Sequence, residues 1–177
     1  MKTKYLPTTI ALSLVAFGII LRLVPHPANF APITAIALFG GSILPRRIAI
    51  VVPVGAMIIS DAIIGFYNIM PVIWICYLLI ALASSHWLRP ARLLRGALLT
   101  ISSSMFFFVV TNFAVWLWGG LYQHTWNGLI NCYTLALPFF RNTAASDALY
   151  TAGFFAVYKL ATYKLVSRQN LAKTKPA

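Results

Sequence analysis

The chain has 177 residues, of which 60% are hydrophobic and only 9% are charged. A soluble domain carries roughly 25% charged residues, so this composition excludes a water-soluble protein and indicates a helical membrane protein that crosses the bilayer several times. The net charge of +12 comes from bases that flank apolar segments. Nucleic-acid binding needs a clustered basic face on a soluble module instead, so we expect no nucleic-acid partner.

Six apolar segments predict an all-α membrane protein, because a bilayer core of ~30 Å needs about twenty residues at ~1.5 Å each. Pro32 and the Gly40–Gly41 pair predict an irregular or tightly packed second helix. A seventh apolar stretch, residues 129–140, is too short to cross and contains Pro138, so we expect a short re-entrant or interfacial helix before the last span. The six predicted spans are residues 5–24, 30–44, 48–67, 69–88, 96–118 and 142–164.

The basic residues predict the orientation of these spans. With a cytoplasmic N-terminus, Arg22 and Arg141 lie outside and the other twelve bases lie inside, as the positive-inside rule requires. We therefore expect both termini in the cytoplasm, one transmembrane domain over residues 1–166, and a basic tail over residues 167–177. This tail is expected to be disordered or to rest on lipid headgroups. The inner bases are Lys2, Lys4, Arg46, Arg47, Arg89, Arg92, Arg95, Lys159, Lys164, Arg168, Lys173 and Lys175.

Polar and aromatic side chains gather at the outer ends of the predicted spans. Ionisable groups inside a membrane are costly unless they are paired or wetted, so they indicate a functional site by default. Two Asp and two Arg at one level are expected to form neutral pairs around a pocket that opens outward; the alternative is that these pairs only hold the bundle together. The candidate substrate-binding residues are Arg22, His26, Asn29, Asp61, Asn112, Trp116, Tyr122, His124, Arg141, Asn142 and Asp147.

Three prolines between Pro25 and Pro32 stiffen the connection after the first span. A rigid polar loop over a membrane pocket is suited to a lid or a recognition loop. The two cysteines, Cys76 and Cys132, match neither a disulfide framework nor a zinc motif. The chain carries no P-loop, and we expect no cofactor, no metal and no catalytic residue.

Three stretches resemble a family of small, uncharacterised bacterial membrane proteins that are described only as transport proteins. They are RLVPHPANFAPITAIALFGG (residues 22–41), SDAIIGF (60–66) and TNFAVWLWGGLYQHTWNGLINCYTLALPFFRNTAASDALYT (111–151). The architecture is similar to that of the S-components of energy-coupling-factor (ECF) vitamin transporters, whose site opens outward beneath the first loop. The resemblance implies that the capping loop contains His26 and Asn29, and that the pocket is bordered by Asp61, Asn112, Arg141 and Asp147.

From these observations we expect a substrate-capturing transport subunit in the bacterial inner membrane, and not an enzyme. It would take up a small, vitamin-like molecule, with energy from a partner ATPase module or from an ion gradient in which Asp61 or Asp147 carries the proton. One alternative is a structural or assembly subunit of a membrane complex. Another is an intramembrane enzyme that acts on a lipid, with His26 or His124 as the base.

Overall fold

The computed structural model describes residues 6–88 and 93–173, which form six α-helices. Each of the first five predicted spans coincides with one helix to within three residues at either end. Of the bases used to predict the orientation, Lys2, Lys4, Arg89, Arg92 and Lys175 lie outside the described residues. The helices are α1 (Leu6–Leu23), α2 (Ile33–Ile43), α3 (Arg46–Ile64), α4 (Met70–Trp87), α5 (Leu93–Trp118) and α6 (Trp126–Lys173).

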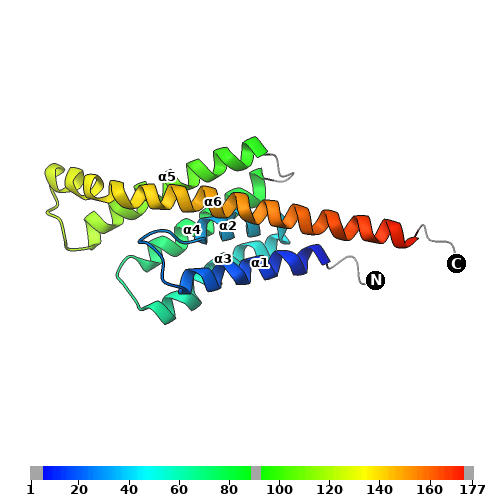
Figure 1. Cartoon of the computed structure of the whole chain (residues 1–177). Coiled ribbons are helices and arrows are strands. Elements are labelled where there is room, and N and C mark those ends of the chain that lie inside the picture. The colour runs from blue at the N-terminus through cyan, green and yellow to red at the C-terminus, as the bar shows by residue number, and fades with distance from the viewer. Residues whose placement is uncertain (1–5, 89–92, 174–177) are drawn as a thin grey trace.

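Helix α2 lies at the centre of the molecule, and the other five helices surround it (Figure 1). It contacts each of them, and neighbours around the ring also touch, in the order α1, α3, α4, α5, α6 and back to α1. Within the described part of the chain, α3 contacts neither α5 nor α6. The central helix therefore lies between α3 and the α5–α6 pair.

The sequence of α2 explains its central position. It has 11 residues, ten of them buried, and none is charged; a helix that is apolar on all sides is stable only when it is surrounded. Small residues allow close packing against α4, because a Cβ atom on Gly41 would lie 2.6 Å from the Ala81 carbonyl oxygen. The Ser84 hydroxyl of α4 also donates a hydrogen bond to the Leu38 carbonyl at 2.5 Å.

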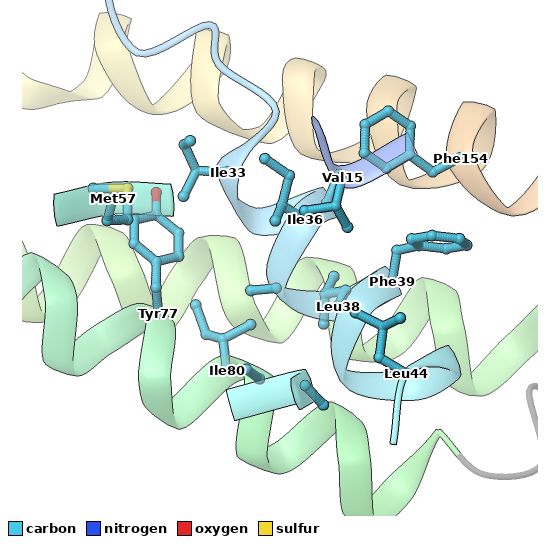
Figure 2. Close-up of a cluster of buried hydrophobic side chains, with 14 of the residues drawn as sticks. Val15, Ile33, Ile36, Leu38, Phe39, Leu44, Met57, Tyr77, Ile80 and Phe154 are labelled. Atoms are coloured by element: carbon cyan, nitrogen blue, oxygen red, sulfur yellow. The ribbon is translucent and has the colours of Figure 1, made fainter. Parts of the chain in front are cut away.

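Aromatic rings fasten α2 to the longest helix. The ring of Phe39 meets those of Phe154, Phe155 and Tyr158 edge to face, with centroids 5.3–5.8 Å apart. Figure 2 shows Phe39 and Phe154 in the cluster of buried apolar side chains that α2 carries into the centre of the ring. Side chains from the surrounding helices pack against this short central helix and form the core.

Helix α6 corrects two expectations. It runs without interruption for 48 residues, including Pro138, so the prediction of a separate short helix over residues 129–140 is wrong. Residues 167–173 of the expected tail also continue this helix, so a tail disordered from residue 167 onward is wrong. At ~1.5 Å per residue α6 is about 72 Å long, more than twice the thickness of a bilayer core. Its first part extends beyond α1–α4 together with α5, and its C-terminal part runs past the other helices (Figure 1).

Three of the described helices, α3, α4 and α5, are long and apolar enough to cross a membrane by length and composition. The apolar part of α1 (Thr8–Leu23) and α2 are shorter. The start of α1 and the end of α6 lie at the same end of the molecule (Figure 1). The opposite end, which we call the loop end, carries the connections over residues 24–32, 65–69 and 119–125.

Candidate functional site

The first polar group is an ion pair between α1 and α3 near the loop end. The Arg22 guanidinium, in the last turn of α1, contacts the Asp61 carboxylate, which is fully buried, while the Arg22 side chain is 10% exposed. The guanidinium also contacts the Ser60 hydroxyl, and its Nη1 lies 3.4 Å from the Met57 carbonyl oxygen. Buried charges need this kind of partner, because leaving one alone costs several kcal/mol.

Helix α4 completes this group through Trp74. Its indole N–H donates to Oδ2 of Asp61 at 2.7 Å, while Oδ1 faces Arg22. Asp61 lies three residues before the end of α3 and Trp74 four residues after the start of α4, so the turn between these helices brings the two side chains to one depth. Both oxygens of the carboxylate are thus held by groups that only donate.

An open hollow of about 340 Å³ lies beside this group at the turn between α3 and α4. Tyr67 lines this hollow, and its phenol lies close enough to Asp61 and Arg22 to interact electrostatically with both charges. Such a mixture of aromatic, apolar and amide groups is typical of small-molecule sites. The lining residues are Phe66, Tyr67, Asn68, Met70, Pro71 and Trp74.

The second polar group surrounds Asp147 on the other side of α2. Asp147 is 1% exposed, and its Oδ2 lies 2.6 Å from the hydroxyl oxygen of Ser104 on α5. Thr34 of α2 is buried beside Asp147 and beside Tyr77 of α4, and its hydroxyl makes no hydrogen bond of good geometry with either. Four helices therefore meet at this carboxyl group.

A small hollow of about 60 Å³ lies between the first loop and the α5–α6 pair, on the loop-end side of Asp147. Thr143 in its lining is one helical turn from Asp147 on the same helix. Asn112 lies in this hollow too, but its amide N–H₂ donates to the Phe108 carbonyl of its own helix at 2.8 Å. The hollow is lined by Asn29, Phe107, Phe108, Thr111, Asn112, Ala136, Phe139, Phe140 and Thr143.

The proline-rich loop is held by hydrogen bonds at two points along it. The Asn142 amide of α6 donates to the Ala28 carbonyl at 3.0 Å. The ring nitrogens of His26 lie 3.2 Å from the Arg22 carbonyl oxygen and 2.9 Å from that of Pro27. Asn29 has a φ of +59°, a left-handed conformation that asparagine tolerates better than most residues. The loop therefore has a fixed shape over the end of α1 and against the interior of α6 at Asn142.

The other expected site residues lie away from both polar groups. The Trp116 indole donates to the Gln123 carbonyl at 3.0 Å, and its ring lies 5.4 Å from that of His124, at the tip of the α5–α6 hairpin. Tyr122 lies in the same connection and is partly exposed. Arg141 is exposed on α6, and in the described part of the chain it forms no ion pair.

Of the two expected Asp–Arg pairs, the structure contains one among the described residues. Arg22 and Asp61 pair, but Asp147 and Arg141 do not, because Asp147 faces α5 and α2 while Arg141 lies on the outside of α6. Sequence reasoning missed Trp74, Tyr67 and Ser104. Trp74 lies at the same depth as Asp61 in the adjacent helix, so the estimate of depth that singled out Asp61 would also have found it.

The family described as "Family of unknown function (DUF6580)" matches residues 2–171 of the chain. No curated protein and no solved structure matches the chain.

Proposed function

The chain belongs to this family of unknown function, and we propose that it is a membrane transport protein that captures a small, partly polar molecule. The molecule enters from the outside at the loop end and is released inward. The substrate class is a vitamin-like heterocycle, and the mode of action is that of a substrate-capturing subunit similar to an ECF S-component. The family match shows that the chain belongs to an uncharacterised family, but it identifies no substrate.

The observation that carries this proposal is the hollow beside the Arg22–Asp61 pair. Its volume of about 340 Å³ falls at the lower end of the range of ~300–1,000 Å³ for small-molecule pockets. Trp74 connects the hollow to the ion pair: its ring borders the hollow, and its N–H donates a hydrogen bond to Asp61. A planar ligand that stacks on Trp74 and Tyr67 would lie next to a fixed positive and a fixed negative charge.

The proposal places six segments across the bacterial inner membrane, with both termini in the cytoplasm. The inner excess of Lys and Arg supports this orientation. Helix α2 is about 16 Å long at ~1.5 Å per residue, so it would cross only together with the rigid first loop, inside the ring of the other helices. Backbone of this kind is tolerated at membrane depth because it is buried in protein.

Native mass spectrometry of the full chain, purified in mild detergent, tests the proposal. We expect a reproducible extra mass of roughly a few hundred daltons, the size of a ligand that fills such a pocket. Trp74→Phe keeps an aromatic ring, though a smaller one, and removes the N–H donor to Asp61. Without this hydrogen bond Asp61 and the aromatic ring beside it lose the fixed geometry that is proposed to bind the ligand, so we expect the fraction of the chain that carries the extra mass to fall.

Trp126→Phe is the matched control, because Trp126 is 80% exposed at the start of α6, away from the hollow. It should retain the bound mass in full. A chain that carries only lipid, or a stable protein partner without a small molecule, would contradict capture and would favour the lipid-enzyme or assembly alternatives.

A further inference from the structure

The two buried aspartates have opposite hydrogen-bond environments. Asp61 is held by the Arg22 guanidinium and the Trp74 indole, which can only donate, and this fits an ionised carboxylate. Asp147 has no Lys, Arg or His bound to it in the described part of the chain. We propose that Asp147 is a proton-binding site, protonated in this conformation, and that it supplies the coupling ion for the transport proposed above, on which this second part rests.

The Ser104 hydroxyl gives the geometric argument. Its oxygen lies 2.6 Å from Oδ2 of Asp147 and 3.0 Å from the carbonyl oxygen of Thr100. A hydroxyl has one hydrogen, so with an ionised Asp147 two acceptors would compete for it. When Oδ2 is protonated, Asp147 donates to Ser104 and Ser104 donates to Thr100. Every close contact is then a hydrogen bond of ordinary length.

Among the residues that the structure describes, the surroundings of Asp147 offer no compensating charge. The titratable group that faces it from α4 is the phenol of Tyr77, which is neutral when it carries its own proton. From α2 it meets the hydroxyl of Thr34, and from α5 the hydroxyl of Ser104. The cation that α1 provides on this level, Arg22, is already bound to Asp61. Burying an unpaired carboxylate here would cost several kcal/mol, whereas a neutral acid avoids that cost.

Two threonine hydroxyls lie between the loop end and this site. Thr143 lies four residues before Asp147 on α6, and Thr111 lies seven residues after Ser104 on α5, so both are on the faces that carry the site. Both threonines line the hollow of about 60 Å³ beneath the first loop. In the proposed step one proton from the outer solution joins the Asp147 carboxylate to give the neutral acid, and it leaves on the inner side after the protein opens there.

Infrared spectroscopy can detect this proton with unusual clarity, because Asp61 and Asp147 are the only acidic side chains of the whole sequence. In the purified full chain at neutral pH we expect a C=O stretching band of a protonated carboxylic acid, although aspartate in water is ionised above about pH 4. The band should vanish in Asp147→Asn and persist in Asp61→Asn. The C-terminal carboxylate is common to all variants and therefore cancels.

Ser104→Ala keeps both acids and provides a second readout. Removing the hydrogen-bond partner should shift the band, whereas Ser103→Ala, the neighbouring buried serine, should leave it in place. A wild-type chain without the band at neutral pH, or a band that survives in Asp147→Asn, would overturn the proton site. These outcomes do not depend on any substrate.

The coupling is tested on the mass that co-purifies with the chain. If proton and substrate bind together, the fraction of wild-type protein that carries this mass falls as the pH rises, and the fraction is independent of pH in Asp147→Asn. If this fraction does not change with pH in the wild type, coupling is refuted. The infrared band still tests separately whether Asp147 binds a proton. If no mass co-purifies, the transport proposal is refuted, but the proton site at Asp147 is not.

Discussion

Arg22 and Asp61 show how single residues fix the loop end of the bundle. The sequence predicted Asp–Arg pairing under both interpretations of the polar residues, because a buried acid needs a cation and Arg22 lies at the matching depth. It did not predict Ser104 as the partner of Asp147, since a serine on an apolar helix carries no charge to signal its role. Which hydroxyl faces an acid depends on how two helices are rotated against each other.

Removing one partner of the pair has a definite expected cost. Arg22→Gln leaves Asp61 buried without its cation, and we expect it to lower the free energy of unfolding by about 3–5 kcal/mol. The double variant Arg22→Gln with Asp61→Asn should recover part of this loss, because no unpaired charge remains. Thermal unfolding in detergent measures both effects.

Arg141→Gln is the matched control for this series, because Arg141 is exposed and forms no ion pair among the described residues. Its effect should stay within about 0.5 kcal/mol, as for other surface substitutions. If the two arginine variants unfold alike, the Arg22–Asp61 pair does not stabilise the fold.

At the scale of elements, α2 is the helix that the others are built around. Its glycines, Gly40 and Gly41, were expected to allow tight packing, and the structure shows that only one of them faces a neighbour closely. A Cβ atom on Gly41 would lie 2.8 Å from Cβ of Ser84, whereas one on Gly40 would meet only Cδ1 of Leu44, at 3.7 Å. The pair thus provides an internal comparison.

Gly41→Ala should lower stability by about 1–3 kcal/mol, the usual range for overpacking a tight core. Gly40→Ala should be neutral or stabilising by up to about 1 kcal/mol, because alanine is the better helix former and the space is open. Thermal melts of the two variants in the same detergent check the difference. Equal melting temperatures would show that α4 yields to a methyl group at this contact.

Helix α6 shows where local signals misled. Pro138 was one reason to expect a short re-entrant or interfacial helix over residues 129–140, because proline lacks the N–H of an interior helical residue. In the structure the helix continues through it, and on both sides of it the helix packs against α5: the Phe108 ring lies 5.6 Å from Tyr133 and 4.7 Å from Phe140. Packing over two turns outweighs one lost hydrogen bond.

The whole molecule has a proposed orientation that labelling can test. Leu121, at the loop end, and Ser167, near the end of α6, are both exposed. In intact cells Leu121→Cys should react with a membrane-impermeant maleimide, and Ser167→Cys should react only after permeabilisation. Cys76 and Cys132 are buried and are first replaced by alanine to remove background. The reverse pattern would place the loop end in the cytoplasm.

Sequence patterns predicted the helical class of the protein, the positions of five helices and the end of the bundle near which Arg22 and Asp61 pair. These follow from apolar length, from the scarcity of charge and from depth along a helix, all of which are local quantities. The tertiary structure alone decided that α2 is central, that Asp61 and Asp147 lie on opposite sides of it, and that Trp74 and Ser104 are their partners. Those features depend on which helix faces which, and apolar segments with little periodic pattern do not encode that rotation in any one stretch of sequence.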